Sequence, residues 1–200
     1  MRRRVLLGGA AASLAGCSVL PERPYQERRE WPLEVRRPTS TLAGPHAPVL
    51  LLRALRAGPG LDARGLRTHQ ADGAENIDNW EEWAVPPPQG VEECLRQWLA
   101  ASGLFSAVVM PGSQVTADFV LEGELVSFVG DPPAGVARAG LSLVLLRASG
   151  SGRFLPVLQR SLTGQATLTG VDGPALAASL QAALASLLAA VEAALAPAVS

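Results

Sequence analysis

Cys17 is the residue whose position most directly suggests chemistry. It ends an apolar run after a Leu-Ala-Gly tripeptide, and three arginines, Arg2 to Arg4, precede that run. A cationic start, an apolar stretch and small residues follow the order of a secretory signal peptide. Leu-Ala-Gly-Cys also matches the bacterial lipobox, in which the thiol is acylated and the chain is cut before the cysteine. The sequence therefore predicts a signal peptide over residues 1–16 and lipidation of Cys17.

The apolar run is too short to be a membrane anchor itself. It extends from Val5 to Ala15, whereas a spanning helix needs roughly 20 residues. An ordinary N-terminal helix with an incidental cysteine is the alternative, but Gly8, Gly9 and Gly16 weaken such a helix. One acyl chain binds a bilayer only marginally, while several hold it stably. We therefore expect palmitate-type acyl chains on the cysteine to tether the mature chain.

Export and sorting depend on residues on either side of the apolar run. An aspartate after the lipidated cysteine signals inner-membrane retention in many Gram-negative bacteria, so Ser18 favours the outer membrane, with the domain facing the periplasm. The Arg-Arg-Arg-Val-Leu-Leu start resembles a twin-arginine export signal, and this route and the general secretory route both stay open. Residues 17–29 then read as the lipidated cysteine and a flexible tether, whose reach of about 20 Å lets the domain stand clear of the headgroups.

The composition is that of one globular domain with a real core. The chain has 200 residues, of which 48% are hydrophobic and 18% charged. Removal of residues 1–16 takes away three of the 17 basic residues, which leaves 14 against 18 acidic residues and a net charge of −4. Nothing basic remains to suggest a nucleic-acid partner. Such mild acidity is also poor at holding anionic lipid by charge.

No constellation of residues suggests catalysis. The sequence has no G-x-S-x-G elbow, no phosphate-binding loop and no cluster of His, Asp and Glu at metal-ligand spacing. Cys94 shares a helical face with apolar residues, so we expect a small buried side chain rather than a catalytic thiol. Glu122 and Glu124 share one face of a strand and are interpreted as solvated. We therefore expect no catalytic residue, no metal, no cofactor and no enzymatic activity.

Apolar periodicity and turn residues divide residues 30–200 into strands and helices. We expect short strands, a helix that stops at Gly103, three long strands joined by tight turns, and a final helix capped by Asp172. Pro156 should push the last strand to an edge or a bulge. The expected strands cover 30–38, 49–57, 66–70, 106–110, 117–130, 136–148 and 153–168, and the helices cover 88–102 and 171–196.

This order predicts a single α+β domain over residues 30–200. Its sheet should be mixed and mainly antiparallel, with two helices packed on one face, as a two-layer sandwich. The outer face of the final helix is alanine and serine apart from Gln181 and Glu192. A neighbour that covers this face and a plain alanine-rich surface are both open interpretations.

One sequence element suggests a family. Trp83-Ala84-Val85-Pro86-Pro87 is followed by a helix, a Leu-Phe turn and a strand, behind a lipobox cysteine and an early strand. In this pattern the chain resembles the ABC-type transport auxiliary lipoproteins, a group that includes the paraquat-inducible lipoprotein and partners of MCE-domain transporters. The resemblance covers residues 30–196, and within it Trp83, Pro86 and Pro87 carry the family pattern and shape the entry of the helix.

The resemblance implies a periplasm-facing accessory subunit anchored in a membrane. Its partners would be an MCE-domain protein and ABC transporter subunits, with the ATPase and permease on separate chains. The system would move lipids or other hydrophobic molecules, and the lipoprotein could form a homo-oligomeric ring. Two rivals stay open: a stand-alone lipid- or ligand-binding envelope lipoprotein with cargo under its helices, and a structural lipoprotein that resembles envelope assembly factors.

Overall fold

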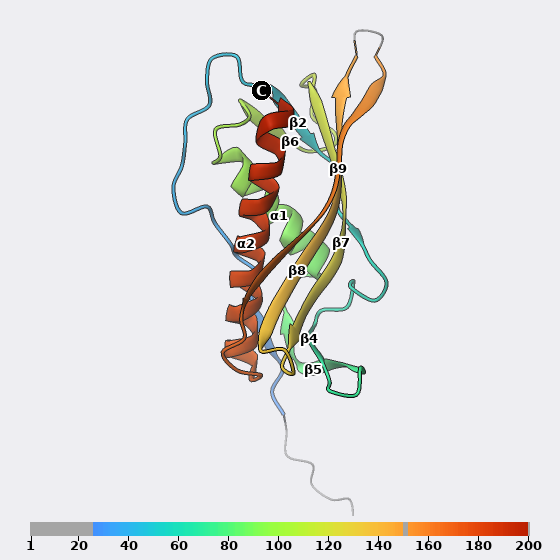
Figure 1. The fold of residues 1–200 in the computed structure, drawn as a ribbon, viewed down its shortest axis with the longest axis vertical. Coiled ribbons are helices and arrows are strands. Elements are labelled where there is room, and N and C mark those ends of the chain that lie inside the picture. Colours follow the sequence, from blue (N-terminus) through green and yellow to red (C-terminus); the bar gives the residue numbers. More distant parts are fainter. Residues whose placement is uncertain (1–25, 150–151, 200) are drawn as a thin grey trace, which may run out of the picture.

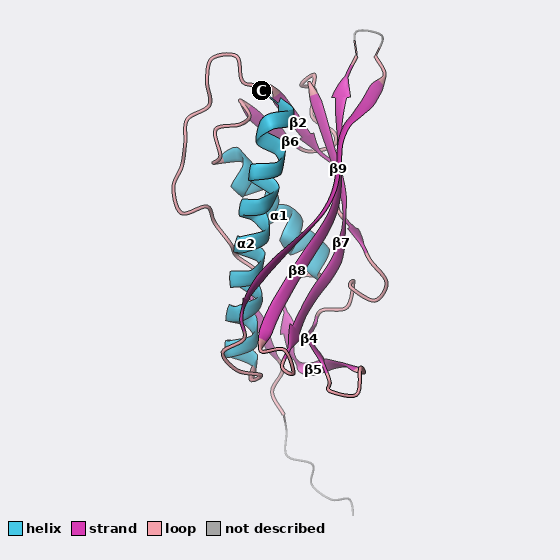
Figure 2. Ribbon diagram, in the orientation of Figure 1, coloured by secondary structure: helices cyan, strands magenta, loops and turns pink. Residues whose placement is uncertain are grey.

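The computed structural model describes residues 26–149 and 152–199, and within them the chain forms an α+β domain with one mixed, open sheet of nine strands and with two helices (Figure 1; Figure 2). This confirms the predicted fold class, while the two-layer arrangement stays a prediction. The elements in chain order are β1 (Arg29–Trp31), β2 (Val49–Leu52), β3 (Arg56–Ala57), β4 (Gly65–His69), β5 (Glu75–Trp83), α1 (Pro87–Ala100), β6 (Ala107–Val109), β7 (Phe119–Asp131), β8 (Val136–Ala148), β9 (Phe154–Thr167) and α2 (Gly173–Val199).

Strand β7 is the hub of the sheet. One of its edges pairs along its whole length with β8, in an antiparallel ladder. The other edge takes three short strands end to end, all parallel to it: β2, then β3, then β4. Strand β5 lies antiparallel to β4 and parallel to β1, which ends the sheet on that side. The long ladders are thus antiparallel, and the short pairings around β7 are parallel.

Strand β9 confirms the expectation placed on Pro156. Among the described residues β9 pairs with β8 alone, so it is an edge strand. Leu145 pairs with Leu158 but Leu146 pairs with Pro156, so one residue of β9, Val157, bulges out of the ladder. Proline has no N–H to donate to a ladder and is therefore tolerated at such a place. The bulge also keeps the edge from being a regular template for another strand.

Helix α2 packs its leucines onto the long strands. It begins as predicted, because the Asp172 carboxylate accepts the N–H of Ala175 at 2.9 Å. At Gly164 of β9 an added Cβ would lie 2.2 Å from the backbone N of Leu187, so glycine is what lets the helix approach the sheet this closely. By length and composition alone α2 could cross a membrane. Its apolar face is buried in the protein core, as in a core helix; the leucines and valine of that face are Leu176, Leu180, Leu184, Leu187, Leu188, Val191 and Leu195.

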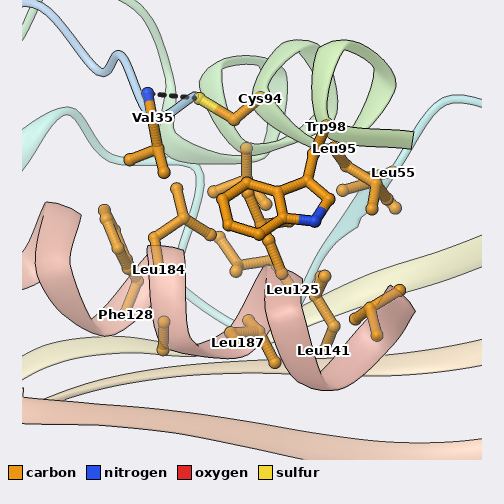
Figure 3. Close-up of a cluster of buried hydrophobic side chains, with 14 of the residues drawn as sticks. Val35, Leu55, Cys94, Leu95, Trp98, Leu125, Phe128, Leu141, Leu184 and Leu187 are labelled. Carbon is orange, nitrogen blue, oxygen red and sulfur yellow. Dashed lines mark hydrogen bonds between the residues drawn. The ribbon is translucent and has the colours of Figure 1, made fainter. Parts of the chain in front are cut away.

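Helix α1 covers another part of the same core, and Figure 3 shows its side chains facing those of α2. It begins at Pro87 rather than Pro88 and ends at Ala100, two residues before the predicted end. Gly103 has a left-handed backbone (φ +79°), so it turns the chain as expected, although Ala101 is the C-cap. The Glu192 carboxylate of α2 accepts hydrogen bonds from Trp98 Nε1 at 2.7 Å and from Arg37 Nε at 2.9 Å.

Three stretches differ from the sequence-based expectation. The strand predicted over 30–38 is limited to β1, and residues 32–36 run on as an extended segment outside the sheet. The strand predicted over 49–57 is split into β2 and β3, and between them the N–H of Leu55 donates to the Glu92 carboxylate of α1 at 2.7 Å. Strand β5 extends through residues 75–78, where a turn was expected.

Candidate functional site

The predicted lipidation site, Cys17, lies outside the described residues. Its acylation, the signal peptide and the tether therefore stay predictions. The other predicted residues, Trp83, Pro86 and Pro87, lie together at the junction of β5 and α1. The candidate site is built from this junction.

Trp83 fixes the end of β5 in the core. Its side chain is 1% exposed and packs on Phe128 of β7, with ring centroids 5.4 Å apart. Its backbone is held on both sides, since its N–H donates to the carbonyl of Arg64 at 2.8 Å and its own carbonyl accepts from the Arg64 guanidinium at 2.9 Å. The next N–H, that of Ala84, donates to Trp31 in β1. The chain therefore leaves the sheet at one defined point.

The prolines set the direction of α1 from that point. Pro86 is the N-cap residue, and Pro87 and Pro88 occupy the first helical positions, where a missing N–H breaks no helical hydrogen bond. The carbonyl of Pro86 accepts the N–H groups of Gln89 and Gly90. Trp83, Pro86 and Pro87 thus lie together at the helix entry, and the part that the family pattern gives them there stays a prediction.

A groove of about 370 Å³ lies between α1 and the extended segment 32–36. Leu33 and Val35 point into the protein and contact the helix, and Gly90 allows this approach because an added Cβ would lie 2.6 Å from Leu33 Cδ2. The floor is apolar and the rim is polar; the lining residues are Pro32, Leu33, Glu34, Val35, Arg36, Ala84, Val85, Gln89, Gly90, Glu93, Cys94 and Gln97. An apolar floor with a polar rim is the usual build of a surface that binds a ligand or a protein segment.

Cys94 lies under this groove and holds the extended segment in place. Its sulfur accepts the N–H of Val35 at 3.3 Å (Figure 3). It also donates to the carbonyl of Leu33 at 3.5 Å. Burial raises the pKa of the Cys94 thiol, and the nearby carboxylates of Glu93 and Glu34 raise it further. A protonated, buried thiol is a poor nucleophile, so the expected structural role of Cys94 fits its surroundings.

The carboxylates that could have suggested acid–base chemistry are paired with arginines. Glu122 binds Arg53 and Glu124 binds Arg56 on the face of the sheet, as expected for a solvated strand face. On the groove rim, hydrogen bonds from Arg96 and Gln97 lower the pKa of Glu93 to about 2. Within residues 26–149 and 152–199 no group of three or more His, Cys, Asp or Glu side chains could hold a metal ion.

Sequence reasoning detected the groove residues but missed the groove. The alternation of Leu33 and Val35 indicated an extended segment with one buried face, which is what the structure contains. The error lay in the backbone pairing, because residues 32–36 were expected to be part of a strand and are not in the sheet. A usable signal was Gly90, a glycine inside a helical pattern, which indicates close approach of another segment.

The described part of the chain is thus an α+β domain with a surface groove beside α1. Comparison with family models matches residues 32–192 to the ABC-type transport auxiliary lipoprotein component family, and the chain belongs to this family. It is a family of transport components in the bacterial envelope rather than of enzymes. The resemblance seen in the sequence is therefore confirmed. Among curated proteins none matches the chain.

Solved structures show the same fold. Protein XCC0632 from Xanthomonas campestris superimposes with a TM-score of 0.68 at 20% sequence identity, over 85% of this chain and 96% of that one. The crystal structure of an uncharacterized protein gives a TM-score of 0.65 at 15% identity, over 84% of this chain and 97% of that one. At these identities the likeness concerns the fold alone.

Proposed function

We propose that the protein is a membrane-anchored accessory lipoprotein of an ABC transport system with an MCE-domain partner, which moves lipids or other hydrophobic molecules across the envelope. The single observation that carries the proposal is a lipobox cysteine, Cys17, placed directly before a domain of the transport auxiliary lipoprotein family. The acyl chains on Cys17 anchor the chain, and Ser18 directs it to the outer membrane, facing the periplasm. The ATPase and permease are separate chains.

The role of the domain in this proposal is positional. The chain docks a transporter component and holds it at the membrane, alone or as a homo-oligomeric ring. The groove beside α1 supports a docking role, because exposed polar side chains such as Glu34 and Gln89 line it together with apolar ones. Its volume is at the low end of ligand pockets, which range over about 300–1,000 Å³.

The stand-alone lipid binder is less well supported. It requires space for cargo under the helices, and that space is filled by leucines that are fully buried between α1, α2 and the sheet (Figure 3); among them are Leu95, Leu125, Leu184 and Leu187. A binder would therefore have to use the shallower groove. Native mass spectrometry of gently purified protein distinguishes the stand-alone binder from the transport accessory protein, because a binder carries co-purified lipid.

Labelling with a palmitate analogue tests the anchor. We expect Cys17→Ala to lose the label and to leave the membrane fraction, since Cys17 supplies the acylated thiol. Cys94→Ala is the matched control, because it removes the other cysteine of the sequence and should keep both the label and the membrane fractionation. Retention of label by the Cys17 variant would refute the anchor.

Co-purification tests the transport assignment. With the membrane anchor intact, affinity capture of the lipoprotein should bring down an MCE-domain protein, a permease and an ATPase. If envelope assembly factors are captured in their place, the structural lipoprotein is favoured. If none of these proteins is captured and lipid is bound to the chain, the stand-alone binder is favoured.

A further inference from the structure

Trp80 lies on a rigid bulge of β5. Gly65 of β4 pairs with Glu82, but Arg67 pairs with Ile77, so one residue of β4 faces four residues of β5. The Asp78 carboxylate closes the bulge, because its Oδ1 accepts the N–H of Trp80 at 2.7 Å and that of Glu81 at 3.0 Å. Bulges of this kind re-aim a side chain out of the sheet. The Trp80 side chain is 42% exposed.

The sequence is built to accommodate this bulge. At Gly65 an added Cβ would lie 2.2 Å from the carbonyl oxygen of Asp78, so any larger residue would collide with the bulged backbone. Trp80 Nε1 has no hydrogen-bond partner in the part of the chain that the structure describes. The bulged backbone thus presents a large amphipathic side chain that is partly exposed.

Two further apolar side chains lie at the same end of the domain. Ile77, on the same strand, is 39% exposed, and Val171, before α2, is 63% exposed. Glu81 of β5 lies against the start of α2, since a Cβ added at Gly173 would lie 2.2 Å from an oxygen of the Glu81 carboxylate. We call Ile77, Trp80 and Val171 the exit patch.

The chain leaves the domain at this patch. Strand β1 runs parallel to β5 with Arg29 opposite Glu81, which places residue 28 level with Trp80. In Figure 1 the start of the described chain lies at the same end as β4, β5 and the start of α2, and the β8–β9 hairpin lies at the opposite end. From Gln26 to Cys17 there are nine peptide steps, which span at most about 30 Å. An acylated Cys17 therefore keeps the exit patch close to the bilayer.

The chemistry of the patch fits the lipid–water interface. Tryptophan prefers the headgroup level, where its ring is in contact with apolar groups and its N–H with polar ones. The arginines beside the patch are engaged in ion pairs, Arg28 with Glu82 at 3.7 Å and Arg29 with Glu81 at 3.1 Å. Attraction to anionic lipid by these charges is therefore weak, and the contact rests on apolar side chains.

We propose that the exit patch lies in the headgroup region of the bilayer that holds Cys17. The domain then stands on the membrane with its β4–β5 end, and the β8–β9 hairpin points away into the periplasm. This rests on the proposed acyl anchor. The sequence led us to expect a domain that stands clear of the headgroups on its tether. In this proposal the domain instead has a fixed orientation on the membrane.

Spin labels test the orientation. The acylated full chain with Cys94→Ala carries a nitroxide either at Trp80→Cys or, as the matched control, at Leu155→Cys on the β8–β9 hairpin, where Leu155 is exposed. In vesicles of phosphatidylcholine without other proteins, the label at position 80 should be several-fold less accessible to a water-soluble nickel chelate than the label at 155. High salt should leave this difference unchanged.

Brominated lipid provides a second readout that needs no label. Tryptophan fluorescence of the acylated Trp31→Phe chain should be quenched by brominated phosphatidylcholine. A further Trp80→Phe change should remove most of that quenching, because the two remaining tryptophans, Trp83 and Trp98, are buried. Circular dichroism checks that each variant is folded.

The outcomes separate the patch from the anchor. Equal exposure of positions 80 and 155 in a chain that floats with the vesicles overturns the patch and leaves the anchor intact. A chain that fails to float overturns both. Shielding of position 80 only after addition of transporter proteins also overturns the proposal, since the patch would then be a protein-docking surface.

Discussion

Glu93 shows how a strong local interaction can coexist with a small contribution to stability. Hydrogen bonds from Arg96 hold its carboxylate in the charged form, and Gln97 adds another. The pair lies on the surface of α1 at i,i+3 spacing, and half of the Glu93 side chain is exposed. Solvent screens such a pair, so its net contribution is a fraction of what its low pKa suggests.

The first prediction concerns the pH dependence of this pair. The pKa of Glu93 is lowered to about 2 in the folded protein, so its stabilisation is present above the ordinary value of 4.5 and is lost as the pH falls from there to about 2. Glu93→Gln should therefore lower the free energy of unfolding by about 0.5 kcal/mol at pH 7 and by progressively less below pH 4.5. Urea unfolding at several pH values measures this. A difference that grows with acidity would contradict the assignment.

At the same scale, the sequence predicted the identity of the important residues better than their contacts. Cys94 was expected to be buried, and it is, but its hydrogen bonds to segment 32–36 depend on a neighbour 59 residues away in the chain. The exposure of Trp80 was equally hidden, because it comes from a bulge that Asp78 and Gly65 define together. Such contacts arise from tertiary structure, which periodicity does not encode.

At the scale of elements, the long strands and α2 were predicted closely and β5 was not. Strand β8 has the predicted bounds, since its alternation of apolar and small residues is regular over its whole length. Strand β5 is rich in Asn, Asp and Glu, which are poor strand formers. It is a strand because β4 and β1 pair with it on both sides, and the parallel pairing with β1 leaves no local signal.

The second prediction tests the contact between β9 and α2. Gly164→Ala should destabilise the protein by about 2–3 kcal/mol, because the new methyl group would collide with the backbone of α2 at Ala183 and Leu187. Gly44→Ala is the matched control, since an added Cβ there meets nothing within 4 Å and the change should stay within about 0.5 kcal/mol. Urea denaturation measures both. Equal stability of the two variants would show that α2 lies further from the sheet.

At the scale of the whole molecule, one carboxylate joins three distant segments. Glu192 of α2 accepts hydrogen bonds from Trp98 of α1 and from Arg37, and the Arg37 guanidinium also contacts Thr39 and Thr41. We call Glu192, Arg37 and Trp98 the clasp. It ties the segment that follows the groove to α1 and α2. Residues 39–48 then pass over the protein without strand or helix.

The third prediction is that loss of the clasp loosens the molecule in a pH-dependent way. Hydrogen bonds from Arg37 lower the pKa of Glu192, so its contribution is present above its ordinary pKa and is lost as the pH falls through the lowered value. Glu192→Ala should reduce the thermal midpoint by several degrees at pH 7 and should speed amide exchange at Thr41. Glu34→Ala, an exposed carboxylate outside the clasp, should change neither. Calorimetry and hydrogen exchange measure the two effects.

The position of β7 at the hub of the sheet has a consequence for how the chain acquires its structure. Strands β2, β3 and β4 precede β7 by dozens of residues, and each pairs with it in the complete sheet. The sheet therefore cannot assemble until residue 131 has been synthesised. Topologies dominated by such distant pairings fold over milliseconds to seconds, slowly compared with helical bundles. During that delay the apolar side chains of these strands lack the partners that cover them in the finished sheet.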